Sequence, residues 1–298
     1  MNIIETKDLF YHYKKFNGDN IPDTVITAIH NMNIQIEQGS FVSIVGENGS
    51  GKSTFAKMLV ALLLPSSGML YIDGKEIEKG TVPFNLCEYV GMVFQNPDNQ
   101  IVAPIVEEDV AFGPENLGIS SDEICERVCN SLKYVEMLEY RNRSTNYLSG
   151  GQKQKIAIAG VLAMQPKCII LDEPTAMLDP QGRKQVIQTI RNLNKTKGIT
   201  VILITHYMDE IVYSDLVYVM HKGAVVLGGA PQELFEGSEV LERYGLEIPQ
   251  IMLLAHKLKE YGLPIDKGII TEEQLISEIL QKAKHITIDV NKAGDNLK

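Results

Sequence analysis

The segment "GENGSGKST", Gly46–Thr54, restricts the fold of this chain more than any other feature. It follows the apolar run "FVSIV" and precedes "TFAKMLVALL", whose apolar residues recur at helical spacing. A glycine-rich turn between a strand and a helix presents backbone N–H groups at a helix N-terminus, where phosphate binds. We therefore expect an α/β fold with a nucleotide phosphate site at this turn, and a mere glycine-rich turn with a surface lysine is the alternative.

The residues of this phosphate loop have separate predicted roles. Backbone N–H groups of the glycines and of the helix start are expected to surround the β-phosphate. The Lys52 ammonium would bridge β- and γ-phosphate oxygens, and the Ser53 hydroxyl would face Mg²⁺. The predicted nucleotide-binding residues are Gly46, Glu47, Asn48, Gly49, Ser50, Gly51, Lys52, Ser53 and Thr54.

Two continuous apolar runs, "CIILDE" and "VILITH", lie further along the chain and are separated by a helical segment. Such runs are typical of buried parallel strands linked by a crossover helix. The first ends at Asp172 and Glu173, whose side chains point in different directions because they are adjacent in a strand. We expect Asp172 to hold Mg²⁺ through a water and Glu173 to orient or deprotonate the attacking water. A solvated pair of carboxylates is the alternative.

Composition excludes several function classes. The formal net charge of the 298 residues is −10, and no block of lysines or arginines is present, so we expect no nucleic-acid partner. No apolar run reaches the length of a membrane helix, and the first residues lack the pattern of a secretory signal. The cysteines (Cys87, Cys125, Cys129 and Cys168) form no CxxC pair. We expect reduced thiols in the cytoplasm.

The rest of the chain divides into three parts by pattern. The first residues alternate as strands do, with a loop expected around "FNGDNIPDT". From Ser120 to Gly160 the pattern is helical, and Ser120 with Glu123 predicts a capping box. After about Gly237 two amphipathic stripes follow. The first contains Ile251, Leu254, Ala255 and Leu258, and the second, after a Thr271-x-x-Gln274 start, contains Leu275, Ile276, Ile279 and Leu280.

A second glycine motif, "LSGGQ" at Leu148–Gln152, also precedes a helix but lacks a lysine that could hold a γ-phosphate. The phosphate loop, "LSGGQ", "IILDEPTAMLD" and "ILITH", in this order, resemble the nucleotide-binding subunits of ATP-binding cassette (ABC) transporters over about residues 1–237. The resemblance implies that two subunits pair head to tail, with each ATP between the phosphate loop of one and the LSGGQ of the other. The residues implied to contact the partner's ATP are Ser149, Gly150, Gly151, Gln152 and Asp179.

The same resemblance assigns further roles. Gln95, after "GMVF", matches the family's glutamine that contacts Mg²⁺ and the attacking water, so the implied Mg²⁺ residues are Ser53, Gln95 and Asp172. His206 matches the histidine that contacts the γ-phosphate and orients water with Glu173. Tyr13 best matches the aromatic residue on which adenine stacks, and Tyr11 on the same strand face is the alternative.

Further segments narrow the family. "FQNPDNQIVAPIVEEDVAFGPENLG" and the C-terminal "LEIPQIMLLAHKLKEYGLP" are similar to the ATPases of energy-coupling factor (ECF) transporters, which import vitamins or transition metal ions. The resemblance implies ATP hydrolysis, a second ATPase subunit in a homodimer or a paralogous heterodimer, a transmembrane coupling subunit, a substrate-binding membrane subunit and a position on the cytoplasmic face of the cell membrane. Coupling helices would contact the groove beside Gln95–Gln100.

The implied fold is a phosphate-loop NTPase core with a β-rich N-terminal subdomain, a helical signature subdomain at about residues 96–165 and an α-rich extension. We expect the ATPase domain at residues 1–237 and a dimerisation extension at residues 238–298, although its stripes equally suit packing within the extension. The competing hypothesis is a soluble ABC ATPase acting on ribosomes or DNA. Many of those proteins contain two fused cassettes or a long coiled-coil insertion. Neither feature is present in this sequence.

Overall fold

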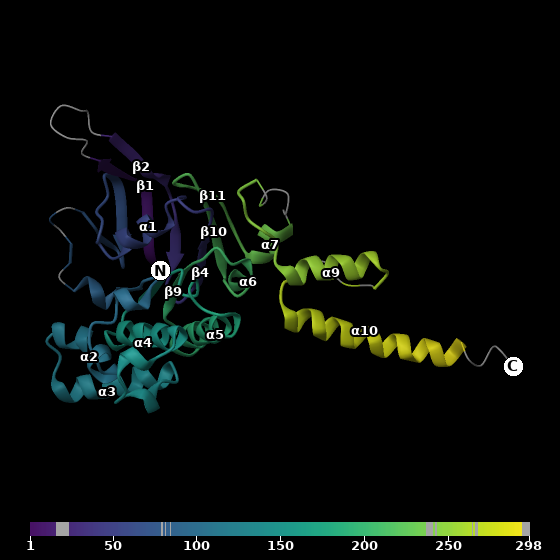
Figure 1. Ribbon diagram of the computed structural model, residues 1–298. Coiled ribbons are helices and arrows are strands. Elements are labelled where there is room, and N and C mark those ends of the chain that lie inside the picture. The colour runs from purple at the N-terminus through teal and green to yellow at the C-terminus, as the bar shows by residue number, and fades with distance from the viewer. Residues whose placement is uncertain are drawn as a thin grey trace.

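Two β-sheets, a group of helices beside them and a C-terminal helical pair make up the molecule (Figure 1). The computed structural model describes residues 1–15, 24–78, 80, 82–83, 85–236, 241, 243–263, 265 and 268–293. The loop expected around "FNGDNIPDT" lies almost entirely outside these residues. Among the described helices, none combines the length and the apolar character that a membrane crossing requires.

The first sheet is antiparallel and contains the β-rich start predicted from the sequence. Its long central strand β1 (Asn2–Lys15) pairs with β2, β3 and β5, and β5 continues through an Asp73–Gly74 turn into β6. The remaining strands are β2 (Thr24–Met32), β3 (Gln35–Glu37), β5 (Ser67–Ile72) and β6 (Lys75–Glu76).

The second sheet has the order β11-β10-β4-β9-β8-β7, and all its strands except β11 run parallel to their neighbours. Every residue of β4, β8 and β9 is buried, as their mostly apolar sequences predict. The carboxyl ends of these parallel strands meet at one edge, where α/β sheets bind ligands. The strands are β4 (Phe41–Val45), β7 (Val90–Val93), β8 (Cys168–Asp172), β9 (Thr200–Ile204), β10 (Leu216–His221) and β11 (Ala224–Gly229).

Helices cover both faces of this parallel sheet. Helix α1 (Lys52–Leu59) lies against the face turned toward the antiparallel sheet and fills that core with Phe55, Met58 and Leu59. The opposite face packs against a group of helices, two of which lie within or mostly within the block predicted from Ser120 to Gly160. These helices are α2 (Val106–Asn116), α3 (Ser121–Tyr134), α4 (Gly150–Ala163) and the crossover helix α5 (Pro180–Lys197), with short 3₁₀ turns between them.

Two predicted helix caps have different outcomes. Ser120 is the N-cap of α3, but its side chain makes no capping hydrogen bond, so the predicted capping box is wrong. The Glu123 carboxylate instead accepts a bond from Nε of Arg127, one turn later, at 3.0 Å. The box before α10 (Glu272–Ala293) is confirmed: the Thr271 hydroxyl accepts from the Gln274 N–H at 3.3 Å, and the Gln274 amide oxygen accepts from the Thr271 N–H at 3.2 Å.

The C-terminal helices α9 (Gln250–Glu260) and α10 extend beyond the main body on the side of α7 (Pro231–Glu236), as Figure 1 shows. A small apolar cluster holds them together. It contains Ala255, Ile265, Ile269 and Leu275, with Ile251, Leu258 and Ile279 packed against it. The predicted stripes are therefore buried only in part, because Leu254, Ile276 and Leu280 are exposed. The predicted domain boundary near Gly237 falls outside the described residues.

Candidate functional site

The phosphate loop connects β4 with α1, and two of its glycines are required by close backbone contacts. Gly51 caps α1 with a φ of 103°, and a Cβ there would lie 2.5 Å from the carbonyl oxygen of Ala28. A Cβ on Gly46 would lie 2.1 Å from the carbonyl oxygen of Met220. Any side chain at these positions would displace the backbone of a neighbouring strand. The glycines thus keep the loop tight at the N-terminus of a helix, a favourable anion site.

Lys52 is the first residue of α1, and its side chain is buried at the loop. Its ammonium donates to the carbonyl oxygens of Gly46 at 2.7 Å and Glu47 at 2.9 Å. Burial lowers the pKa of Lys52, whereas the carboxylates of Glu173 and Asp172 act in the opposite direction. The lysine therefore places a poorly solvated cation where loop and carboxylates meet.

Ser53 and Asp172 come from different elements and form the part of the site suited to a divalent cation. The Ser53 hydroxyl donates to Oδ1 of Asp172 at 3.0 Å. Burial raises the pKa of Asp172, and the bond from Ser53 opposes this shift. A hydroxyl and one carboxylate are oxygen donors of the kind Mg²⁺ takes beside nucleotide phosphates. These residues therefore fit Mg²⁺.

Glu173 follows β8 and lies at the centre of three strand ends. Its Oε2 accepts a hydrogen bond from Nε2 of Gln95, after β7, at 2.9 Å. The same oxygen lies 3.7 Å from Nδ1 of His206, after β9. The Glu173 backbone adopts a left-handed φ of 47°, unusual for a residue other than glycine, and its N–H donates to the Ile204 carbonyl at 2.9 Å. This conformation turns the chain out of the strand direction directly after Asp172.

The predicted adenine-stacking residue lies close to the phosphate loop. The Tyr13 side chain is 38% exposed, and its hydroxyl is 3.3 Å from Oγ1 of Thr54. Tyr11 packs against the core between the sheets, and burial raises its pKa. The two rings meet edge to face, with centroids 4.9 Å apart. Tyr13 therefore offers the more accessible ring face of the two.

The LSGGQ motif lies in a groove that is separate from the phosphate loop. Ser149 caps α4 and forms a capping box with Gln152, since its hydroxyl accepts the Gln152 N–H at 3.3 Å and the Gln152 amide oxygen accepts the Ser149 N–H at 2.9 Å. Asp179 caps α5 by accepting the Gly182 N–H at 2.7 Å. Both caps line a groove of about 420 Å³, together with Gly150 and Gly151. Among the described residues that line this groove, none belongs to the phosphate loop.

Hydrogen bonds tie the segment after Gln95 to the helix that carries LSGGQ. Gln100 accepts the Phe94 N–H at 3.1 Å and donates to the Ala157 carbonyl of α4 at 3.3 Å. Lys153 of α4 forms an ion pair with Asp98 at 2.6 Å. Sequence reasoning missed these links, because the residues that form them are far apart in the chain.

Sequence reasoning also missed a buried polar contact behind Glu173 and His206. The carboxylate of Glu210, on the short helix α6 (Met208–Ile211), accepts hydrogen bonds from the hydroxyls of Thr175 and Thr205, each at 2.6 Å. The signal that could have indicated a buried carboxylate was the position of Glu210 directly before the apolar Ile211 in a buried segment.

Comparisons with known proteins place the chain in a family. A sequence model of the family described as "ABC transporter" matches residues 29–176. The "Energy-coupling factor transporter ATP-binding protein EcfA1" of Clostridium novyi (strain NT) is 50% identical over 280 residues, covering 94% of this chain and 98% of the relative. The protein of the same name from Clostridioides difficile (strain 630) is 48% identical over 281 residues, covering 94% of this chain and 99% of the relative.

Solved structures agree with the sequence relatives. The structure of cbiO1 from Clostridium perfringens, described as part of the ABC transporter complex cbiONQ, superposes with a TM-score of 0.71 at 39% identity and covers 84% of this chain and 97% of that one. A dimeric post-hydrolysis state of the ATP-binding cassette MJ0796, bound to ADP and Pi, gives a TM-score of 0.66 at 30% identity and covers 76% of this chain and 98% of that one. With half of its residues shared along nearly its whole length, the chain belongs to the energy-coupling factor transporter ATP-binding proteins of the ABC transporter family.

Proposed function

We propose that this chain hydrolyses Mg²⁺-bound ATP and thereby energises an ECF-type importer of vitamins or transition metal ions. The observation that carries the proposal is the arrangement around Glu173. Its carboxylate accepts a hydrogen bond from Gln95 at 2.9 Å and lies 3.7 Å from His206. The preceding residue, Asp172, contacts Ser53 of the phosphate loop. A base oriented by two neighbours beside a phosphate site is the arrangement that hydrolysis requires.

Each residue of the site then has a definite task. The phosphate loop binds the triphosphate through its backbone N–H groups and the Lys52 ammonium, and Tyr13 stacks on adenine. Ser53, Asp172 and Gln95 would hold the Mg²⁺, which would supply positive charge beside the phosphates. The Glu173 carboxylate accepts a proton from the attacking water.

Gln95 and His206 act on the same Glu173 oxygen in this proposal. The Gln95 amide holds the carboxylate by a direct hydrogen bond. His206 lies 3.7 Å from the same oxygen and would orient the water and contact the γ-phosphate. Precise orientation of this kind contributes to rate because the base must lie within hydrogen-bond reach of the proton that it removes.

We further propose that the LSGGQ groove completes the site of a second ATPase subunit, either another copy or a paralogue. Its lining of Ser149, Gly150, Gly151 and Asp179 contains two helix N-termini, which favour phosphate, but no described phosphate-loop residue. ATP bound between the subunits would close the dimer, and hydrolysis would open it. We assign residues 1–237 to the ATPase domain, about 96–165 to its helical subdomain, and 238–298 to an extension that supports dimerisation.

The membrane partners are inferred from the relatives and from exposed apolar side chains. The EcfA1 relatives are named for energy-coupling factor transporters, and the cbiO1 structure is described as part of cbiONQ. Two apolar side chains that follow Gln95–Gln100 in the chain, Val102 and, on α2, Phe112, are 61% and 50% exposed. We propose that coupling helices of a transmembrane subunit contact the Gln95–Gln100 segment and these exposed side chains, and that a separate membrane subunit binds the substrate. The chain would then be peripheral, on the cytoplasmic face of the membrane.

Affinity purification of the tagged full-length chain from its native membranes tests the transport role. We expect ATPase activity in the purified complex, together with a transmembrane coupling subunit and a small substrate-binding membrane protein identified by mass spectrometry. Recovery of ribosomes or DNA without membrane proteins would reject the transport role and favour the competing hypothesis. A parallel purification with Val102→Asp and Phe112→Asp should retain the second ATPase but lose the membrane subunits.

A further inference from the structure

Helix α6 carries a glutamate that is almost completely buried and has both carboxylate oxygens occupied. Glu210 is 6% exposed. Its Oε1 accepts the Thr175 hydroxyl and its Oε2 accepts the Thr205 hydroxyl, each at 2.6 Å. The two threonines belong to different segments, one after β8 and one after β9, so a single carboxylate joins two strand ends.

Both threonines lie next to residues of the hydrolytic site. Thr175 is two residues after Glu173, and the Ala176 N–H donates to the Glu173 carbonyl at 3.2 Å, which closes the turn between them. Thr205 directly precedes His206, and its hydroxyl oxygen also accepts the Tyr207 N–H at 3.0 Å. This second bond closes a turn around His206. The Thr205 hydroxyl therefore connects the histidine turn to Glu210.

We propose that Glu210 is a positioning residue for hydrolysis, because its carboxylate fixes the segment after Glu173 relative to the turn that carries His206. The short separation of Glu173 and His206, 3.7 Å between Oε2 and Nδ1, depends on this tie. The inference rests on the proposed roles of Glu173 and His206. Glu210 itself acts through these neighbours and does not touch the reacting groups.

The surroundings of Glu210 make the tie rigid. Thr175 and Thr205 are buried, so loss of the carboxylate would leave two buried hydroxyl groups without their acceptor. Burial raises the pKa of Glu210, and the bonds from the two threonines oppose that shift. Satisfied hydrogen bonds between buried groups fix the relative positions of the groups they join.

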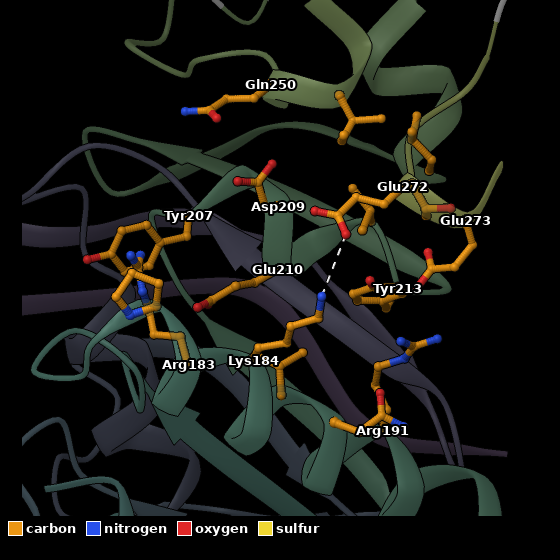
Figure 2. A pocket seen from close by; sticks show the side chains of 17 residues that line it. Arg183, Lys184, Arg191, Tyr207, Asp209, Glu210, Tyr213, Gln250, Glu272 and Glu273 are labelled. Atoms are coloured by element: carbon orange, nitrogen blue, oxygen red, sulfur yellow. Dashed lines mark ion pairs between the residues drawn. The ribbon is translucent and has the colours of Figure 1, made fainter. Parts of the chain in front are cut away.

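A residue suited as a matched control lines the same groove as Glu210, a groove of about 400 Å³ between α5, α6 and the C-terminal helices (Figure 2). Asp209 and Glu210 are neighbouring carboxylates in its lining, but Asp209 is exposed. In Figure 2 the Glu210 side chain extends toward Arg183, whose guanidinium lies over the ring of Tyr207 at 4.2 Å. Asp209→Ala thus removes a carboxylate from the same helix and groove but leaves the threonine tie intact.

The first experiment measures steady-state ATP hydrolysis by full-length Glu210→Ala, Glu210→Gln and Asp209→Ala. We expect Glu210→Ala to lower kcat on the order of 10²-fold, as misplacement of catalytic groups does, with KM for ATP within about twofold. Glu210→Gln should recover most of the lost kcat, because its amide accepts one threonine hydroxyl and donates to the other oxygen. Asp209→Ala should match the wild type. An equal loss in Glu210→Ala and Asp209→Ala, or a change in KM alone, would overturn the proposal.

A double-mutant cycle separates positioning from general stabilisation. If Glu210 acts through the histidine turn, adding Glu210→Ala to His206→Ala should cost less than about threefold, since the groups that it aligns are no longer paired. Equal losses in both backgrounds would reject the inference. If Glu210→Ala does not fold, Thr205→Val and Thr175→Val serve instead, because each removes one hydroxyl at similar volume and should lower kcat. Unchanged turnover in Glu173→Gln would instead reject the proposed function itself.

Discussion

Glu173 shows how one residue combines backbone strain with a defined chemical environment. Its left-handed φ of 47° redirects the chain immediately after Asp172, so the two adjacent carboxylates serve different neighbours. Asp172 contacts Ser53 of the phosphate loop, and Glu173 contacts Gln95. An unfavourable backbone conformation persists only where the surroundings enforce it, and here the Glu173 N–H is bonded to the Ile204 carbonyl.

Glu173→Gln tests the predicted base. The substitution keeps the shape and a hydrogen-bonding oxygen but removes the proton acceptor. We expect kcat to fall by about 10²- to 10⁴-fold, the usual contribution of a general base. ATP affinity, measured with a fluorescent analogue in the presence of Mg²⁺, should remain within about threefold, because Lys52 and the phosphate loop are unchanged. Lys52→Ala is the control that should lose binding; turnover at the wild-type rate in Glu173→Gln would exclude the assigned role.

The reactivity of the cysteines tests the burial of individual residues without any need for bound nucleotide. Cys168 lies within strand β8 and is fully buried, and burial raises the pKa of its thiol, whereas Cys125 is exposed on α3. Iodoacetamide at pH 8 should therefore modify Cys125 in the folded chain and reach Cys168 at least about a hundredfold more slowly, because modification of Cys168 requires opening of the core. Peptide mass spectrometry with and without guanidinium checks this; equal rates in the folded chain would show that β8 is accessible.

Residues with local signals were predictable, and residues defined by tertiary contact were not. Lys52 and Ser53 are specified by a contiguous motif between a strand and a helix. Glu210 is recognisable only once Thr175, which is 35 positions away, is brought against it by the pairing of β8 and β9. No periodicity in the sequence encodes that contact. The match to the family favoured Tyr13 over Tyr11, but the exposure of each ring could not be predicted from the sequence.

At the scale of elements, apolar patterning identified strands better than polar spacing identified helix caps. Strands β4, β8 and β9 are buried throughout, and their sequences are predominantly apolar. A capping box forms only when both side chains hydrogen-bond to the backbone. The Glu123 carboxylate instead accepts a hydrogen bond from Arg127, one turn away. Gln274 bonds the backbone N–H of Thr271 as the motif predicts.

The two caps give a paired prediction. Thr271→Ala removes a side chain that accepts the Gln274 N–H and should destabilise the start of α10 by about 1 kcal/mol. Ser120→Ala removes an N-cap hydroxyl that makes no such bond, so the stability of α3 should change much less. Native-state hydrogen exchange of the first-turn amides of α10 and α3 measures both local free energies. A larger loss at α3 than at α10 would contradict the observed caps.

At the scale of the whole molecule, two phosphate-compatible surfaces are separate. The phosphate loop joins β4 to α1, while the LSGGQ groove is lined by α4 and α5. The overall fold could be predicted from the order of motifs, because each motif specifies its own strand or helix terminus. How far the amphipathic C-terminal stripes are buried could not, because the pattern does not say which neighbour covers Leu254, Ile276 or Leu280.

The separation of the two surfaces leads to a prediction about dimers. If ATP joins the phosphate loop of one chain to LSGGQ of another, Asn48→Cys and Ser149→Cys chains, mixed on a Cys125→Ser background, should crosslink through a short bifunctional thiol reagent. ATP at 100 times its Kd would favour a closed form that alone binds it by about 2.7 kcal/mol per site. Crosslinking should therefore depend on ATP and be strongest with Glu173→Gln, which keeps ATP unhydrolysed.

A control variant and the identity of the product make this crosslink decisive. Lys133→Cys places a thiol on the exposed side of α3 and, mixed with Asn48→Cys chains, should give no ATP-dependent product. Mass spectrometry then distinguishes a product between chains from one within a chain. An ATP-dependent interchain product establishes that two copies of this chain share the nucleotide. If only the addition of a paralogous ATPase carrying the partner cysteine yields the product, the functional unit is a heterodimer; a product confined to single chains would remove the basis for pairing LSGGQ with a second phosphate loop.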